Sequence, residues 1–235
     1  DMLAAGHAIQ ALLNSSRTLF DDLIRQEKLN CEWETKGLLF VFQTPRAFEH
    51  YAHTDELLRR EFAMPAKRFN SKELEALEPA LKPGMAGGYL YESDGHLRPD
   101  RLMSELHRVL LEQGVEVREG SEVIGFVREN GKAAAVRTKN GDIKADHFVI
   151  ATGAWTPLFN RELGCRIPIQ PGKGYSMTMP RPAVCPTYPL IFEEHRVAVT
   201  PFASGYRLGS TMEFAGYDYT LNRSRLSILT DAAKL

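Results

Sequence analysis

The chain has 235 residues, of which 43% are hydrophobic and 25% charged, and its formal net charge is −1. This composition is typical of a globular protein of one or two domains with a sizeable core. The low charge, without basic clusters, argues against nucleic acid or an anionic membrane as partner, and no apolar run approaches the roughly 18 residues of a membrane-spanning helix.

The first and last segments both predict helices. In residues 1–30 apolar side chains recur at the spacing of one helix face. They are Leu3, Ile9, Leu12, Leu13, Leu19, Phe20, Leu23 and Ile24. Residues 222–235 also predict a helix, with no glycine or proline to end it. Because position 1 is not methionine and both ends lie in predicted helices, we expect a fragment of a longer protein.

Short strands and helices follow the first helix. Residues 36–45 are mostly apolar and end at Pro45, which predicts a strand. Residues 46–62 and 71–79 predict two helices, the second with Ser71 as its N-cap.

A strand, a helix and a second strand come next. Residues 87–95 predict a strand that runs into a turn, and Pro99 opens a helix that Gly114 caps. Residues 115–119 predict the second strand. Such a strand–helix–strand unit usually builds a parallel sheet.

Two Asn-Gly turns give the clearest local signal. Asn130-Gly131 and Asn140-Gly141 separate three alternating segments, and Asn-Gly adopts the positive φ angles of a tight hairpin turn. We therefore predict a three-stranded meander. It leads into the apolar run 148–151, which suits a strand buried on both faces.

After Cys165 the predicted elements are mainly strands. They lie at 167–170, 174–179, 188–192, 196–200 and 205–212, separated by proline and glycine. A run of strands of this kind indicates a mostly antiparallel sheet.

The stretch VIATGAW, residues 149–155, has the features of a nucleotide-binding turn. Gly153 lacks a Cβ where another group must approach, and Thr152 and the turn amides can hydrogen-bond a sugar or a phosphate. The alternative is a glycine turn that ends a core strand. Its position after the Asn-Gly meander favours the binding interpretation.

Several motifs in this order resemble a known superfamily. They are YESDGHLRPDRLMSELHRVLLEQGVEVREGSEVIGFV, IKADHFVIATGAWTPLF, PIQPGKGYSMT and RVAVTPFASGYRLGSTMEFAG. Together they resemble the flavin-dependent D-amino acid dehydrogenase and glycine oxidase (DAO-type) oxidoreductases, over essentially the whole chain. KGYS and GSTMEF are most similar to the bacterial D-amino acid dehydrogenase branch.

The resemblance implies an α/β (α+β) fold with two interleaved domains. One is a partial FAD/NAD(P)-binding-type domain that includes the meander, and the other is a mostly antiparallel β-sheet substrate domain. The first would comprise residues 1–30 and 85–160, the second 31–84 and 161–221, and 222–235 would return as a helix toward the FAD domain.

The chain lacks a glycine fingerprint of the dinucleotide-binding kind. Gly172 and Gly174 precede a predicted strand and not a helix. The resemblance implies that the fingerprint lies upstream of Asp1. It also implies that C-terminal strands outside the chain bring the arginine that pairs with the substrate carboxylate.

The resemblance assigns FAD contacts to two stretches. Val123 would meet the adenine through its backbone. The adenosine and diphosphate would lie along Ala151, Thr152, Gly153, Ala154 and Trp155.

Three further residues would lie near the flavin ring. Lys173 and Gly174 would contact FAD and Tyr175 the substrate; the alternative, a glycine turn that merely begins a strand, is the one that the residues alone favour. Glycine oxidases carry a tyrosine shortly before the proline equivalent to Pro201. Here the sequence reads Val197–Thr200, which leaves the substrate open.

Other polar residues give weaker signals. His50 and His53 share a helix face but lack a third ligand, so we expect no metal site. His96 is expected to be structural and Glu213 to be a hydrogen-bonding structural acid. Neither Glu193 nor Glu194 has the context of an acid/base pair.

The cysteines indicate the compartment. Cys31, Cys165 and Cys185 are too few and too widely spaced for a disulfide framework or a zinc site. With no secretory leader, we expect a reducing, cytoplasmic location and three inert, partly buried thiols.

The resemblance implies an enzyme that oxidises an amino acid, a D-amino acid in this branch, at Cα by hydride transfer to FAD. The product would be an imino acid that hydrolyses to a keto acid. Oxidation of a 2-hydroxy acid or a secondary amine on the same scaffold remains an alternative. A non-catalytic binding module is another, and the isolated fragment is expected to be inactive. The oligomeric state is open, and membrane association of the parent is not indicated.

Overall fold

The computed structural model describes residues 2–232, which fall into two compact units. The first holds the chain up to Glu112, Gly174–Thr211 and the segment from Asn222; the second holds Gln113–Lys173 and Met212–Leu221. The ends of the two predicted terminal helices, residues 1 and 233–235, lie outside the described residues. These divisions differ from the predicted domain limits, and the assignment of FAD and substrate domains stays a prediction.

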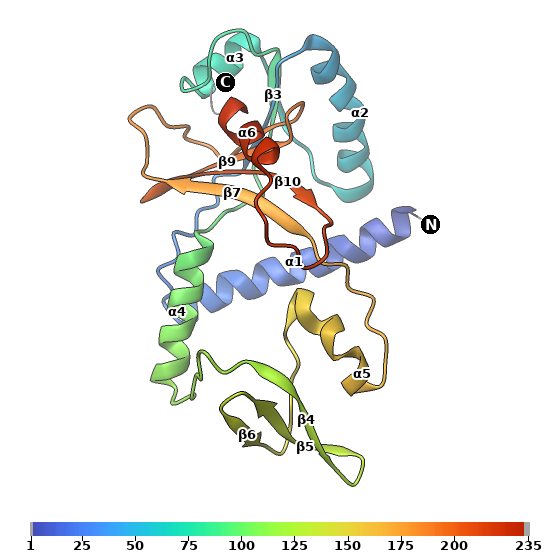
Figure 1. The fold of residues 1–235 in the computed structure, drawn as a ribbon. Coiled ribbons are helices and arrows are strands. Elements are labelled where there is room, and N and C mark those ends of the chain that lie inside the picture. Colours follow the sequence, from blue (N-terminus) through green and yellow to red (C-terminus); the bar gives the residue numbers. More distant parts are fainter. Residues whose placement is uncertain (1, 233–235) are drawn as a thin grey trace. The chain divides into compact units, whose positions relative to one another are not determined.

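A seven-stranded sheet forms the centre of the first unit (Figure 1). Its order is β2 (Lys67–Asn70), β3 (Gly87–Tyr91), β1 (Leu38–Phe42), β8 (Leu190–Phe192), β9 (Val197–Phe202), β10 (Gly205–Glu213) and β7 (Lys173–Met179). β1 and β8 run parallel, whereas β2–β3, β3–β1, β8–β9 and β9–β10 are antiparallel. The predicted, mostly antiparallel sheet is confirmed.

The predicted strand–helix–strand unit is wrong. β3 pairs antiparallel with β1 and β2, because its five residues are all buried and fit the interior of the large sheet. The helix α4 (Pro99–Glu112) follows as predicted, but residues 115–118 form no strand. Val115 and Val117 are exposed, and no described strand lies beside them to complete a hydrogen-bond ladder.

One face of the sheet carries the main core. A transverse row of paired residues crosses five strands and is buried throughout: Leu90, Leu39, Leu190, Val199 and Leu208. Two helices supply leucines to the same cluster, α3 (Ser71–Leu77) through Leu74 and α6 (Arg223–Ala232) through Leu229. Figure 1 shows α6 lying over the sheet beside β9.

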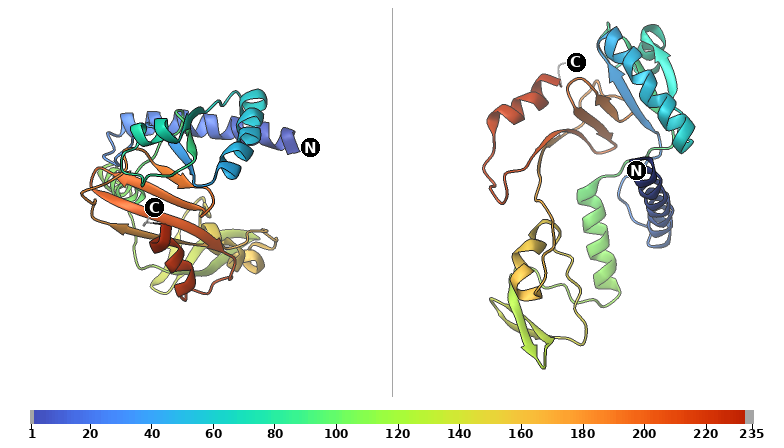
Figure 2. Two further views of the ribbon diagram at one scale, coloured as in Figure 1. Left: turned by 90° about the horizontal axis from the view of Figure 1, so that it is seen from above. Right: turned by 90° about the vertical axis from the view of Figure 1, so that its right-hand side faces the viewer.

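The opposite face is covered over only part of its width. α2 (Pro45–Phe62) packs on β1 and β3, as both views of Figure 2 show. Its Tyr51 stacks on Phe40 at 5.5 Å between ring centroids and packs on Tyr89 at 5.0 Å. Within the first unit, α2 leaves β8, β9 and β10 uncovered on this face.

The helices form close to their predicted positions, with one change of cap. α1 (Met2–Gln26) matches the first predicted helix. The N-cap of α3 is Asn70 and not Ser71, because Asn70 Oδ1 accepts from the Glu73 amide while the Glu73 carboxylate accepts from the Asn70 amide. This reciprocal pair satisfies two amides, which a cap at Ser71 would not achieve.

The second unit contains the predicted meander. β4 (Val123–Glu129), β5 (Lys132–Thr138) and β6 (Gly141–Lys144) pair antiparallel. At the first turn Asn130 and Gly131 have φ angles of 51° and 77°, as an Asn-Gly hairpin requires. A short 3₁₀ helix, η1 (Gly153–Phe159), and α5 (Asn160–Leu163) complete this unit.

Besides residues 115–119, two more predicted strands of the second unit do not form. Residues 148–151 and 167–170 have no regular structure, and Val149 is 92% exposed. An apolar run becomes a buried strand only where neighbouring strands complete its hydrogen-bond ladder. None of the strands in the described chain pairs with either segment.

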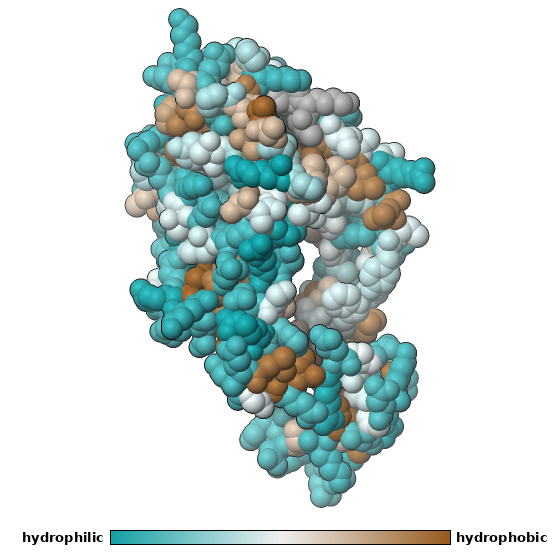
Figure 3. Space-filling view, turned by 90° about the vertical axis from the view of Figure 1, so that its left-hand side faces the viewer, coloured by the Kyte–Doolittle hydropathy of each residue, from teal (hydrophilic) through white to brown (hydrophobic). Residues whose placement is uncertain are grey.

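The surface in Figure 3 is mainly hydrophilic, with apolar residues exposed in separate patches. Over residues 2–232, no helix is both long and apolar enough to cross a membrane.

Candidate functional site

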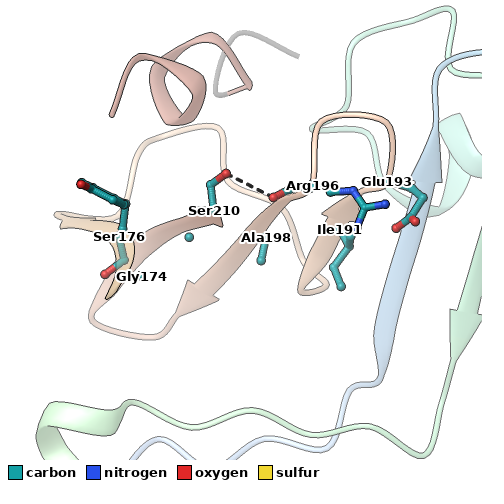
Figure 4. Close-up of a pocket in the computed structure, with 9 residues that line it drawn as sticks. Gly174, Ser176, Ile191, Glu193, Arg196, Ala198 and Ser210 are labelled. Atoms are coloured by element: carbon teal, nitrogen blue, oxygen red, sulfur yellow. Dashed lines mark hydrogen bonds between the residues drawn. The ribbon is translucent and has the colours of Figure 1, made fainter. Parts of the chain in front are cut away.

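The uncovered half of the large sheet forms a pocket of about 530 Å³. Its lining comes from four strands and the β8–β9 turn: Gly174, Tyr175, Ser176, Ile191, Glu193, Arg196, Ala198, Gly209 and Ser210. Figure 4 shows Ile191 and Ala198 pointing to the side of the sheet opposite α6. A volume in this range is typical of small-molecule sites.

The floor of the pocket is one transverse row of the sheet. Ile191 pairs with Ala198, and Ala198 pairs with Gly209. All three are partly exposed, whereas the neighbouring residues on the other face are buried. The floor is therefore apolar, and its side chains become smaller from Ile191 through Ala198 to Gly209.

Two opposite charges stand at one end of the floor, at the first and last residues of the turn 193–196 between β8 and β9. Glu193 and Arg196 lie in the turn, outside both strands, and both line the pocket (Figure 4). The Ser210 hydroxyl donates to the Arg196 carbonyl at 3.2 Å. Among residues 2–232, neither the Glu193 carboxylate nor the Arg196 guanidinium has a hydrogen-bond or ion-pair partner, so both are available to a ligand.

Two of the predicted site residues border this pocket. Gly174 is exposed, and a Cβ there would meet no atom within 4 Å. Tyr175 is 4% exposed, its ring belongs to the main core, and its hydroxyl accepts from the Asn222 amide at 3.1 Å. The neighbouring Ser176 is the exposed hydroxyl on this strand, and a substrate contact by Tyr175 stays a prediction.

Lys173, the last predicted residue of this group, anchors a loop of the second unit. Its Nζ lies 2.6 Å from Glu213 Oε1, and it donates to the carbonyls of Asp218 and Thr220 at 3.0 and 2.7 Å. Glu213 is thereby the structural acid that the sequence indicated. Because the Lys173 ammonium is held by these oxygens, a direct contact with a cofactor stays a prediction.

The predicted nucleotide turn lies in the same unit and opens η1. Gly153 has φ +52°, a left-handed conformation that favours glycine, and the space beside it is open. Thr152 Oγ1 lies 3.0 Å from Thr156 Oγ1. Ala151 and Trp155 are exposed, so the turn presents backbone and an aromatic ring at the surface.

The turn is tied to the loop that Lys173 anchors. Trp155 Nε1 donates to the Tyr219 hydroxyl at 3.0 Å, and the Tyr217 hydroxyl donates to the Ala154 carbonyl at 3.0 Å. Asp218 accepts from the Thr220 amide and hydroxyl, which lowers the pKa of its carboxyl. These bonds make the turn and the loop one connected element.

Val123, the predicted adenine contact, begins β4 and pairs with Thr138 next to an irregularity in the ladder. It is half-buried. A bulge beside a ligand is a common way to aim backbone groups, and the adenine contact stays a prediction.

The pocket residues on β8 to β10 escaped the sequence reasoning. The predicted strands show which residues of each strand share a face. They do not show which residues of neighbouring strands lie side by side, and the row Ile191–Ala198–Gly209 depends on that pairing register. The sequence marks Glu193 only as a carboxylate without an acid/base partner and predicts no role for Arg196. The sequence cue is that both lie in a short polar segment between two apolar strands.

The remaining candidates have ordinary surroundings. The rings of His50 and His53 lie 5.9 Å apart between centroids, and no group of three metal-binding side chains occurs in the described chain. The backbone amides of His96 and Glu34 each donate a hydrogen bond to the other residue's carbonyl, in keeping with a structural role.

The cysteines differ in exposure. Cys31 is buried and Cys185 half-buried, but Cys165 is exposed, which corrects the expectation that all three are partly buried. Cys165 follows Gly164, whose left-handed conformation ends α5 at the surface. Burial raises the pKa of the Cys31 and Cys185 thiols and lowers their reactivity.

Comparisons with known proteins agree with this description. Residues 2–234 match the family DAO, described as FAD dependent oxidoreductase. The chain is 29% identical to a D-amino acid dehydrogenase of Granulibacter bethesdensis over 95% of the chain and 54% of that protein. It is 32% identical to a D-amino acid dehydrogenase of Chromohalobacter salexigens over 92% of the chain and 52% of that protein. The chain thus spans about half the length of the curated relatives it matches.

A solved structure shares the fold. Glycine oxidase from Bacillus cereus superposes with a TM-score of 0.80 at 21% identity, over 95% of this chain and 62% of that one. L-proline dehydrogenase from P. horikoshii superposes with a TM-score of 0.75 at 22% identity, over 94% of this chain and 60% of that one.

Proposed function

Because the chain belongs to the DAO family of FAD-dependent oxidoreductases, we propose that the protein containing it oxidises a D-amino acid at Cα. The match over residues 2–234 carries this proposal. Two relatives named D-amino acid dehydrogenase, 29% and 32% identical, support the choice of substrate class. We keep a cytoplasmic location and a small-molecule partner as parts of the same proposal.

The residues present fit FAD. The turn at Ala151–Trp155 offers exposed backbone, a left-handed Gly153 with open space beside it, and an exposed indole. Such a turn can receive a sugar or a phosphate through its amides. Ala151, Thr152, Gly153, Ala154 and Trp155 would hold the adenosine and diphosphate portion, and Val123 the adenine.

The pocket on the large sheet fits the substrate side of the reaction. An amino acid is a zwitterion, and Arg196 and Glu193 present a cation and an anion at one end of an apolar floor. Arg196 would bind the α-carboxylate together with the arginine that the resemblance places outside the chain, and Glu193 would bind the α-ammonium, because charge-assisted hydrogen bonds orient a small ligand most strongly. Ser176 adds an exposed hydroxyl at the opposite end.

The chemistry required of this chain is positioning. Bound FAD supplies the hydride acceptor for the Cα–H bond, and the amine loses a proton. The resulting imino acid is hydrolysed by water to a keto acid and ammonia. Fixing the substrate in one orientation and excluding water are the contributions expected of the side chains.

Two alternative functions are compatible with the same residues. The first is oxidation of a 2-hydroxy acid or a secondary amine, and the fold shared with an L-proline dehydrogenase keeps it open. The second is a non-catalytic module that binds a small molecule in the pocket. A 2-hydroxy acid has no ammonium for Glu193 to bind, which favours an amine or an amino acid over a hydroxy acid.

The test uses the full-length protein that contains this chain. We expect purified protein to show a flavin absorbance spectrum that bleaches under anaerobic conditions on addition of D-amino acids, but not of L-amino acids or 2-hydroxy acids. A flavoprotein bleached only by a hydroxy acid or a secondary amine would establish the first alternative. A protein that no amine, amino acid or hydroxy acid bleaches would contradict the proposal.

A further inference from the structure

The row that forms the pocket floor begins under α2. Read across five strands, it runs Tyr89, Phe40, Ile191, Ala198 and Gly209. The two aromatic members are covered by Tyr51 of α2, and the other three lie in the open pocket. Side-chain size therefore falls from an aromatic ring to a hydrogen atom along a single row.

We propose that Ala198 and Gly209 set the size of the substrate side chain, and that the pocket takes D-amino acids whose apolar side chain is larger than a methyl group. This inference rests on the proposed function. The floor beneath such a side chain is apolar, and the charged groups stand apart at the Glu193–Arg196 end. A branched or aromatic side chain would cover Ala198 and Gly209 and remove their apolar surface from water.

Gly209 supports this interpretation because neither the fold nor the backbone requires a glycine there. Its φ lies outside the left-handed region, and a Cβ would meet no atom within 4 Å. Gly88 of the same sheet is different, since a Cβ there would lie 2.9 Å from the Phe40 carbonyl oxygen. A glycine inside a strand weakens it, so one without a packing reason marks a place where a ligand comes close.

Ala198 gives the same result from the centre of the floor. It lies between Ile191 and Gly209 in the pairing register and is only partly buried. Its neighbours along the strand, Val197 and Val199, point into the core and are 0% and 1% exposed. A larger side chain at Ala198 would therefore enter the pocket and not the core.

The experiment compares Ala198→Phe and Gly209→Val in the full-length flavoprotein. D-alanine, D-valine, D-leucine and D-phenylalanine are supplied in turn, and kcat and KM are measured for each. Ala133→Phe is the matched control, because Ala133 is an exposed alanine of β5 in the second unit. One methylene in an apolar pocket changes discrimination by about 10- to 200-fold. We expect kcat/KM for D-leucine and D-phenylalanine to fall about tenfold or more in both pocket variants, with D-alanine changed less than about threefold.

A second measurement works without turnover. Acetate, isovalerate and phenylacetate are carboxylates whose Cα carries only hydrogen, an isopropyl group and a phenyl group, respectively, and their dissociation constants are measured by calorimetry. In the parent protein, isovalerate and phenylacetate should bind more tightly than acetate, and Gly209→Val should abolish that preference while it keeps the flavin spectrum. If Ala198→Phe fails to fold, Gly209→Val decides alone, because open space surrounds its new side chain.

The outcomes separate the two proposals. If D-amino acids bleach the flavin but their relative kcat/KM values are the same in both pocket variants as in Ala133→Phe, the size inference is overturned and the proposed function stands. A parent protein that prefers D-alanine or charged D-amino acids would also overturn it. If no D-amino acid bleaches the flavin, the proposed function fails, and this inference fails with it.

Discussion

The ion pair between Lys173 and Glu213 should hold the loop 213–220 and, through it, the turn at Trp155. We would change Lys173 to Met, Glu213 to Gln, and both together. Lys173 Nζ and Glu213 Oε1 lie 2.6 Å apart, and the two side chains are 20% and 14% exposed. The lysine also binds the Asp218 and Thr220 carbonyls. Lys173→Met therefore removes the cation and both loop contacts.

The magnitude follows from the distance and the burial. At an effective dielectric constant of about 20, the Coulomb attraction over this distance is about 6 kcal/mol. Desolvation and side-chain entropy offset most of it, so we expect a coupling free energy of about 1–3 kcal/mol between the two positions. Lys173→Met alone should lower the free energy of unfolding by about 3 kcal/mol, because it leaves the Glu213 carboxylate without this cation.

The assay is urea unfolding of the full-length protein and its three variants, followed by circular dichroism. A double-mutant cycle isolates the pair from the other contacts of each residue. A coupling free energy below about 0.5 kcal/mol would refute the structural role. The flavin spectrum adds a second readout. If Lys173 acts through the loop, Lys173→Met and Glu213→Gln weaken FAD binding together, whereas a direct flavin contact would shift the flavin absorbance in Lys173→Met only.

Three further predictions concern stability and the turn. Glu78 is 1% exposed and accepts hydrogen bonds from the Thr187 and Tyr188 amides at 2.6 and 3.1 Å. Glu78→Ala should therefore lower the free energy of unfolding by about 3 kcal/mol or more, and Glu78→Gln by clearly less. Equal urea midpoints for the two variants would contradict this prediction. Burial lowers the pKa of His96, so its contribution to stability is present above its ordinary value of 6.5 and is lost as the pH falls through the lowered folded value. The free energy of unfolding, measured at several values from pH 5 to 7.5, should thus depend less steeply on pH in His96→Gln than in the parent protein. Parallel curves for the two proteins would contradict this role of His96. Gly153→Val places a branched residue at φ +52° and should lower the free energy of unfolding by about 1–2 kcal/mol. The control Gly164→Val, at φ +68°, should lower it by a similar amount. Only Gly153→Val should raise the dissociation constant of FAD.

The sequence predicted local elements well where each carried its own signal. The backbone preference of Asn130-Gly131 forms the hairpin turn. In α1 and α2 the spacing of the apolar residues is itself the signal for a helix. Residues 148–151 failed because a buried strand depends on neighbours that its own residues do not encode. The strand β3 forms as predicted, but its expected parallel unit does not, since its partners β1 and β2 come earlier in the chain and pair antiparallel with it.

The site followed the same division. Gly153 is predicted from the sequence as a place where a missing Cβ lets another group approach. The structure gives it a φ of +52° and open space beside it, and the approach of a ligand stays a prediction. The pocket floor was not predictable, because Ile191, Ala198 and Gly209 meet only through register. Lys173 was expected near a cofactor, but its oxygen partners lie about forty or more residues away in the chain. Such long-range contacts leave no local pattern.

The division into two compact units has a consequence for how the protein could have arisen. The chain passes between the units after Glu112, before Gly174, after Thr211 and before Asn222. Neither unit is therefore encoded by one uninterrupted stretch of gene. Exchange of the smaller unit between relatives would need two matched recombination events, one for residues 113–173 and one for the short segment 212–221. We therefore expect the two units to have diverged together, as one hereditary block.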